Sequence, residues 1–267
     1  MADDPPTTDK PVPIGKQNAA AEQPPADVPR SLSPGRQVTS ATSATDAEVA
    51  DFIARIKTSE PTTAGRRGRL VFAMDATMSR APTWDMALEL QSTMFAAVRD
   101  VGTLDVQLAY FRGAGECRTS KWVSNPDALA RLMTAIECRG GQTQIAKILG
   151  HVRREAEAGL VSAMVYVGDA MEEAIDEVCG KAGEVGLLGV PVFLFQEGDD
   201  TQATRAFKEV ARITKGAHCR FDEGSARQLS ELLSAVAVYA AGGRKALERL
   251  SHQQNGAGAR LLLGQMR

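Results

Sequence analysis

The stretch LVFAMDATMS, residues 70–79, joins the pattern that decides the fold to a group of polar side chains. Residues 70–74 form a continuous apolar run, which is typical of a short strand buried on both faces of a sheet. Asp75, Thr77 and Ser79 follow that run two residues apart. This spacing allows a loop at the end of a strand to turn several oxygen atoms inward. The stretch therefore predicts a buried strand that ends in a set of oxygen ligands.

Strand patterns alternate with helix patterns along the rest of the chain. Strands are expected at residues 70–74, 104–111, around 121–123, 162–167, 191–195 and 217–221, and helices at 84–99, 126–137, 144–157, 172–185, 201–214 and 225–240. The glycine-bearing turn at 112–116 predicts an antiparallel hairpin for the second and third strands. Because alternating strands and helices indicate right-handed crossovers, the expected fold class is α/β. It would be a doubly wound, mostly parallel central sheet with one antiparallel edge strand and helices on both faces.

The chain divides into four segments by composition. Residues 1–45 hold eight of the twelve prolines and no aromatic residue, so we expect a disordered arm rich in Pro, Ala, Ser and Thr. A short helix and linker are expected at 46–64, the folded domain at 65–240, and a helical tail at 241–267. The tail ends near Leu261-Leu262-Leu263, which either docks on the domain or binds another molecule.

Composition and charge exclude several classes of function. The chain has 267 residues, 43% of them hydrophobic and 24% charged, which is ordinary for a globular protein. A net charge of -2 gives no bulk attraction to nucleic acid or to an anionic membrane. With neither a signal-peptide pattern nor an apolar run of about 20 residues, the chain is expected to be cytoplasmic. Four widely spaced cysteines and three scattered histidines argue against zinc, redox or histidine-based sites.

Two more pieces of chain carry oxygen atoms to the same expected place. Thr143 ends the glycine-bearing loop Gly140-Gly141-Gln142-Thr143 before a helix, and Asp169 follows the strand at 162–167. In a doubly wound sheet, ligands bind outside the carboxyl ends of the strands, where the strand order reverses. Together with Asp75, Thr77 and Ser79 they would supply two carboxylates and three hydroxyls. Such a set, without nitrogen or sulfur, suits a hard cation, Mg²⁺ or Mn²⁺.

These residues resemble a known motif. The region from about 66 to 240 resembles the von Willebrand factor A (VWA) family, whose metal-ion-dependent adhesion site (MIDAS) has the motif D-x-S-x-S, a distant Thr and a distant Asp. This chain offers Asp75-x-Thr77-x-Ser79, Thr143 and Asp169. Thr77 stands where the family usually has serine, and its extra methyl group is expected to crowd the metal and weaken its binding.

The resemblance implies protein binding rather than catalysis. In that mode the two carboxylates act partly through water, the hydroxyls bind the metal directly, and a partner's Asp or Glu completes the coordination. Bacterial relatives often serve AAA+ ATPases, so such an ATPase is a partner class that the resemblance suggests. A rim of charges that selects the partner is expected on the surrounding loops: Arg112, Glu172, Glu173, Glu197, Asp199 and Asp200.

Two other functions stay open from the sequence. A phosphohydrolase of the haloacid dehalogenase type also places an Asp and Mg²⁺ after its first strand, but it needs D-x-D-x-T, and position 77 is Thr. No phosphate-binding glycine motif follows a strand either. The other alternative is a metal-independent scaffold of the same fold that assembles through its leucine-rich tail.

Overall fold

The computed structural model describes residues 67–266 except residues 100, 160 and 222–224. The arm expected at 1–45 and the helix and linker expected at 46–64 lie outside the described residues.

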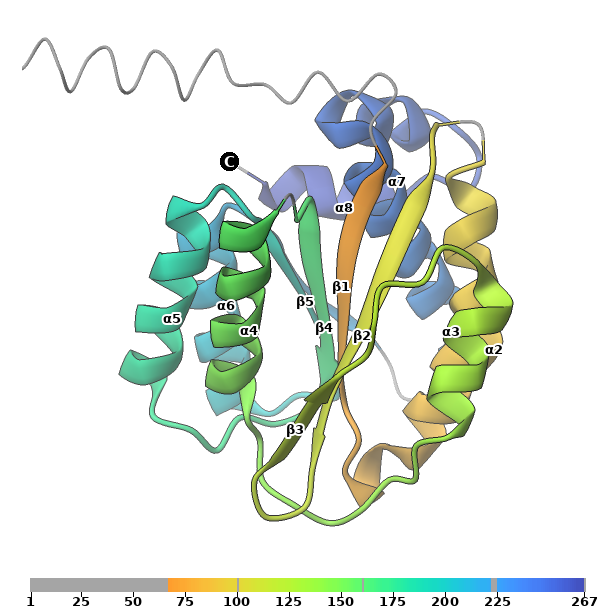
Figure 1. Ribbon diagram of the computed structural model, residues 1–267. Coiled ribbons are helices and arrows are strands. Elements are labelled where there is room, and N and C mark those ends of the chain that lie inside the picture. Colours follow the sequence, from red (N-terminus) through yellow and green to blue (C-terminus); the bar gives the residue numbers. More distant parts are fainter. Residues whose placement is uncertain (1–66, 100, 160, 222–224, 267) are drawn as a thin grey trace, which may run out of the picture. The chain divides into compact units, whose positions relative to one another are not determined.

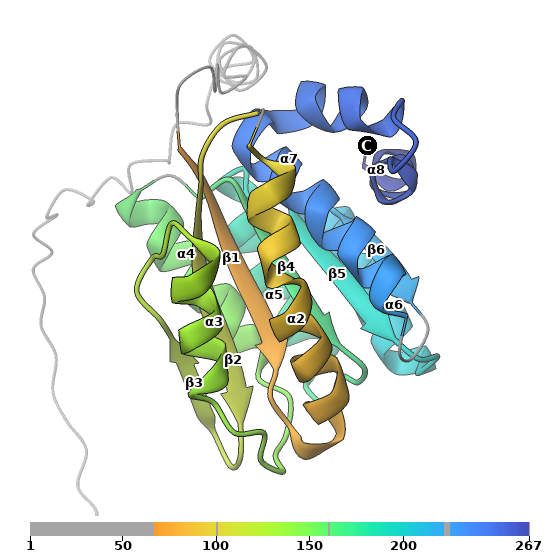
Figure 2. The same cartoon turned by 90° about the vertical axis from the view of Figure 1, so that its right-hand side faces the viewer.

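A six-stranded sheet forms the centre of the described domain (Figures 1 and 2). Its strands are β1 (Gly68–Asp75), β2 (Leu104–Arg112), β3 (Glu116–Thr119), β4 (Ala163–Gly168), β5 (Val192–Glu197) and β6 (Ala217–Phe221). Their order is β3-β2-β1-β4-β5-β6, and every pairing is parallel except that of β2 with β3. The winding direction therefore reverses between β1 and β4. This confirms the doubly wound, mostly parallel sheet with one antiparallel edge strand.

Helices cover both faces of the sheet. One face carries α2 (Ala81–Ala97), α3 (Pro126–Thr134) and α7 (Ala226–Ser251), and the other carries α4 (Ile145–Ala158), α5 (Ile175–Leu187) and α6 (Thr201–Thr214) (Figures 1 and 2). The short 3₁₀ helix η1 (Met78–Arg80) leads into α2, and α8 (Ala257–Gln265) follows α7.

Strand β1 explains why residues 70–74 are apolar at every position. Leu70, Phe72 and Met74 belong to the core under α2 and α7, whereas Val71 and Ala73 belong to the core under α4 to α6. None of the five is more than 1% exposed. Because successive side chains of a strand point to opposite faces, a strand covered on both faces must be apolar throughout.

In the hairpin of β2 and β3, the second strand begins earlier than expected. We expected the third strand around residues 121–123, but β3 begins at Glu116, which pairs with Arg112. Three loop residues suffice because Gly113 and Gly115 both have positive φ, 60° and 102°. The apolar residues at 122 and 123 lie outside β3. Val123 makes one isolated bridge with Val106, and the ring of Trp122 lies under the guanidinium of Arg69.

The C-terminal segment packs on the same chain. Helix α7 continues past residue 240, where we expected a boundary, and is kinked at Gly243, where φ is 67°. Helix α8 packs against α7 and β6 and buries Leu262 completely. Its Gln265 Oε1 accepts a hydrogen bond of 2.8 Å from the backbone N–H of His218, on the outer edge strand β6. None of the described helices has the length and hydropathy that crossing a membrane requires.

Candidate metal site at the carboxyl ends of β1 and β4

The structure brings all five predicted oxygen ligands together. Asp75, Thr77, Ser79, Thr143 and Asp169 line one cavity of about 180 Å³. The cavity lies at the carboxyl ends of β1 and β4, two neighbouring strands at which the winding reverses. Ligands bind at this position in doubly wound sheets.

One wall of the cavity is the β1 loop, residues 75–80. The carboxylate of Asp75 is buried, and its Oδ1 accepts a hydrogen bond of 2.8 Å from the backbone N–H of Thr77. This bond folds the loop back on itself, so that Thr77 Oγ1 and Ser79 Oγ come within 3.2 Å of each other. Two hydroxyls therefore stand beside the first carboxylate.

Burial changes the protonation of Asp75. Desolvation raises the pKa of this carboxyl from 3.8 to about 6, although hydrogen bonds from Thr77 oppose the shift. The negative charge of Asp169 raises the pKa of Asp75 further. A bound cation would favour the ionised form of Asp75, so the electrostatics of the cavity fit a positive ligand.

The other wall is the α4 loop, residues 137–144. The backbone N–H of Thr143 donates to Glu172 Oε2 over 3.0 Å, and the backbone N–H of Glu172 donates to Thr143 Oγ1 over 2.9 Å. The carboxylate of Glu173 accepts hydrogen bonds from the N–H groups of Ile145 and Ala146, at 2.6 and 2.9 Å. It therefore caps the N-terminus of α4. The backbone at Ala174 is extended, with ψ of 122°, so α5 begins at Ile175 rather than at residue 172 as expected.

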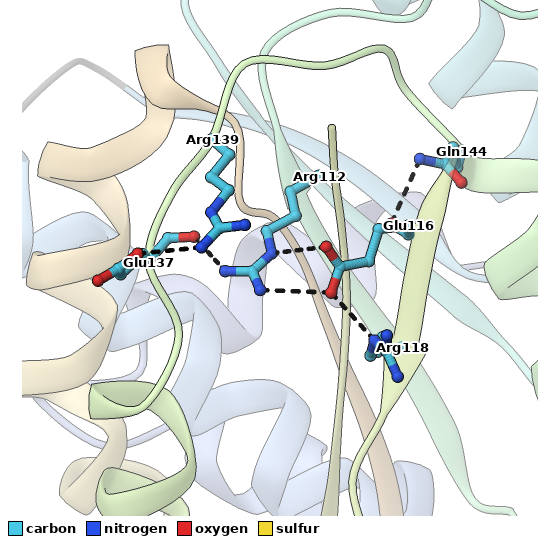
Figure 3. A network of polar contacts seen from close by, with 6 residues as sticks. All are labelled: Arg112, Glu116, Arg118, Glu137, Arg139 and Gln144. Carbon is cyan, nitrogen blue, oxygen red and sulfur yellow. Dashed lines mark hydrogen bonds and ion pairs between the residues drawn. The ribbon is translucent and has the colours of Figure 1, made fainter. Parts of the chain in front are cut away.

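The β2–β3 hairpin supports the same loop (Figure 3). Arg112 forms two hydrogen bonds with the carboxylate of Glu116, at 3.0 and 3.3 Å, and donates to the backbone oxygen of Glu137 over 2.5 Å. Its pKa is raised by these contacts with Glu116. The backbone N–H of Arg139 donates to the oxygen of Ala76 over 2.9 Å and ties the α4 loop to the β1 loop.

Arg80 is the residue of this site that the sequence analysis missed. Its side chain is only 8% exposed, and its Nη1 contacts Glu197 Oε2 in a buried ion pair. Its Nε lies 3.4 Å from Asp169 Oδ2, and its Nη2 donates to the backbone oxygen of Ser79 over 3.0 Å. The hydroxyl of Thr83 also contacts Glu197 Oε2. Arg80 thus connects the candidate ligand Asp169 with the β1 loop and with the end of β5.

The structure places the six expected rim residues differently. Glu197 is a correction: it lies in the interior, 5% exposed, because Arg80 and Thr83 bind its carboxylate. Arg112 and Glu173 hold the loops as described, and the carboxylate of Asp200 accepts from the N–H of Ala203 and caps α6. Glu172 and Asp199 are exposed.

The side chains present fit a magnesium or manganese ion by their chemistry. The described residues contain no group of three or more His, Cys, Asp or Glu side chains that could hold a metal. A cation in this cavity would therefore depend on hydroxyl oxygens beside its two carboxylates. Such all-oxygen sets suit hard divalent cations better than they suit zinc.

Comparisons with known proteins agree with this architecture. No protein-family model and no curated protein matches the chain. A solved von Willebrand factor type A structure from Catenulispora acidiphila is similar, with a TM-score of 0.52 and 13% identity over 66% of this chain and 43% of that chain. The VWA domain of SpRpn10 has a TM-score of 0.50 and 10% identity, over 66% of this chain and 97% of that domain. The pilus adhesin SpaC from Lactobacillus rhamnosus GG has a TM-score of 0.52 and 11% identity, over 65% of this chain and 30% of the adhesin.

The fold is that of a VWA domain. At these identities the likeness establishes the architecture alone. The chain spans less than half of the Catenulispora protein and less than a third of the adhesin, so the activities of those whole proteins do not transfer with the fold.

Proposed function

We propose that this VWA domain is a protein-interaction module that binds Mg²⁺ or Mn²⁺ through Asp75, Thr77, Ser79, Thr143 and Asp169. The observation that supports the proposal is that these five side chains, from three separate segments, line a single cavity. The bound ion would supply an electrophilic centre with a vacant coordination position. A carboxylate from a partner protein would fill that position.

The residues around the cavity have matching tasks in this proposal. Glu172 and Glu173 hold Thr143 and the start of α4 in place. Arg80 orients Asp169 and keeps part of its charge neutralised until a cation arrives. The exposed Met78 beside the ligands gives the partner an apolar contact next to the ion. An AAA+ ATPase is the partner class that we propose to test, by analogy with bacterial VWA proteins.

Calorimetric titration of Mg²⁺ and Mn²⁺ into chelator-treated protein tests the metal site. We expect saturable binding of one ion, which is lost in the variant Asp75→Ala, Asp169→Ala. Asp199→Ala is the matched control, because it removes an exposed carboxylate outside the cavity. Equal binding by the wild type and the double variant would contradict the proposed ligands.

The partner carboxylate needs a second measurement. Candidate AAA+ ATPases are passed over immobilised protein in Mg²⁺ and in EDTA, and their binding is followed by surface plasmon resonance. The proposal predicts binding only in Mg²⁺, and its loss when a single Asp or Glu of the partner is replaced by Asn or Gln. Binding of the same strength in EDTA would reject a metal-bridged contact.

A further inference from the structure

A second cavity lies away from the candidate metal site, beside the edge strand β3. It has a volume of about 420 Å³ and is bounded by β3, α4 and α5. Cys117 and Thr119 line it from β3, Lys147 and Arg154 from α4, and Lys181 from α5. None of the candidate metal ligands borders it. We call this cavity the β3 groove.

The β3 groove is basic, although the chain as a whole has a net charge of -2. Four cationic side chains and one carboxylate line it: Lys147, Arg153, Arg154, Lys181 and Glu177. Arg153 and Lys181 are paired with Glu184 at 3.3 and 2.8 Å. Burial lowers the pKa of His151, also in the lining, which favours its neutral form.

Two of these cations lack an acidic partner among the described residues. Lys147 donates only to neutral oxygens, those of Gly115 and Gln144, and Arg154 takes part in no ion pair there. Both are exposed and lie seven residues apart, on the same side of α4. Gly150 lies between them, without a side chain to fill the space. Lys147 and Arg154 are therefore free to bind acidic groups that enter the groove.

The backbone of β3 is open on the side away from β2. The N–H of Ser120 donates to the oxygen of Leu108 over 2.8 Å, which makes these two residues a hydrogen-bonded pair. Since such pairs alternate along an antiparallel ladder, Cys117 and Thr119 belong to the non-bonded pairs, and their N–H and C=O groups point outward. In the described part of the chain, no group bonds to these outward atoms.

The other edge of the sheet, strand β6, is covered. Helix α8 packs against β6, and Gln265 satisfies the N–H of His218. An unprotected edge strand is a template for another chain, and proteins usually cover or block it. Here one edge is covered by α8, while the other presents free backbone groups beside two unpaired cations.

We propose that the β3 groove binds an extended acidic segment of a partner protein, which adds to the sheet as a strand next to β3. Backbone hydrogen bonds to Cys117 and Thr119 would hold the segment. Because strand side chains alternate between faces, every second side chain of the segment would face α4. Asp or Glu at these alternate positions would pair with Lys147 and Arg154.

Fluorescence anisotropy of a labelled peptide with the full chain tests this proposal. The probe is an octapeptide of alternating Asp and Val, and the comparison probe has Lys in place of Asp. Both are titrated in EDTA, so that no metal-bridged contact contributes. We expect saturable binding of the acidic peptide alone, and affinity lowered at least tenfold in Lys147→Glu, Arg154→Glu. The control Arg131→Glu, Lys208→Glu has the same change in charge at exposed positions outside the groove, and it should bind like the wild type.

A second pair of variants tests the added strand. Thr119→Pro removes an outward N–H, whereas Thr119→Ala keeps it, and proline is tolerated on an edge strand when its missing donor faces outward. Binding should fall at least tenfold in the proline variant alone. Equal binding by these two variants would overturn strand addition.

A third variant separates this proposal from the metal site. Asp75→Ala, Asp169→Ala should bind the acidic peptide as the wild type does, in EDTA and in Mg²⁺. Binding that requires Mg²⁺ or is lost in this variant would overturn the groove as the site. The proposal is also overturned if the groove variant and its charge-reversal control bind the acidic peptide equally, whatever the result of the metal titration.

Discussion

The β1 loop and the α4 loop form opposite walls of one cavity, but different contacts hold them. The β1 loop is fixed by charge: Arg80 joins it to Glu197 and Asp169 in the interior. The α4 loop is fixed by close backbone approach and by partly buried hydrogen bonds, among them those between Thr143 and Glu172. Removing the buried charge of Arg80 should therefore act on the first wall, and adding a side chain at Gly141 should act on the second.

The largest expected effect comes from removing the buried cation. Arg80→Met leaves the carboxylate of Glu197 in the interior without its partner, and breaking such a pair from one side costs about 3–5 kcal/mol. Urea unfolding of the chelator-treated protein measures this loss. The double variant Arg80→Met, Glu197→Gln should lose clearly less stability than Arg80→Met alone, because no unpaired charge remains. Additive effects of the two substitutions would contradict the ion pair as the element that fixes this wall.

A smaller change in the free energy of unfolding, in the stabilising direction, is expected for Asp75→Asn at pH 7. In the metal-free protein its pKa is about 6, above the ordinary value of 3.8, so the native state binds more protons between these values. Stability from this group is present below pH 4 and is lost as the pH rises through 6, by at most about 3 kcal/mol. Asp75→Asn removes this dependence while its Oδ1 still accepts from Thr77. The variant should be more stable than the wild type at pH 7 and equal to it at pH 4.

Urea unfolding of both proteins from pH 4 to pH 7 measures that difference. Burial lowers the pKa of His218 to about 4. The stability that this residue contributes is therefore lost as the pH falls, which is opposite to the pH dependence from Asp75. His218 is present in both proteins, and its contribution cancels when they are compared at each pH. A difference between them that does not change with pH would show that burial of Asp75 is not its cause.

The sequence predicted the β1 wall in part. The D-x-T-x-S spacing follows the apolar run of β1 directly, so local pattern was enough to place Asp75, Thr77 and Ser79. It could not show that Arg80 pairs with Glu197, because these residues are 117 positions apart and meet only across the strand ends. One signal was available. Arg80 is the N-cap of α2, and a cation at a helix N-terminus is unfavourable unless a carboxylate compensates it.

The α4 wall was harder to predict, since its residues are placed by other elements. Thr143 could be named from its glycine-bearing loop, but its partner Glu172 was expected to be a free rim charge in a helix that in fact begins at Ile175. The early return of β3 has a different and local origin: two glycines with positive φ close the hairpin within three residues. The alternation of short apolar strand patterns with helix patterns predicted the sheet well because each pattern is a local property.

The smallest expected effect separates two adjacent glycines in the α4 wall. A Cβ at Gly141 would lie 2.3 Å from the backbone N of Gly113, whereas a Cβ at Gly140 would meet nothing within 4 Å. Gly141→Ala therefore forces the α4 loop away from the hairpin, at a cost of about 1 kcal/mol, and moves Thr143 with it. Gly140→Ala is the matched control and should leave both stability and metal affinity unchanged.

Calorimetric titration with Mg²⁺ distinguishes this wall from the other. Gly141→Ala should weaken binding about tenfold, because it displaces one hydroxyl and leaves both carboxylates in place. Equal affinities of the two alanine variants would mean that Thr143 adds nothing to the site. The β1 wall and Asp169 would then hold the ion without the α4 loop, whose close packing would serve only the hairpin.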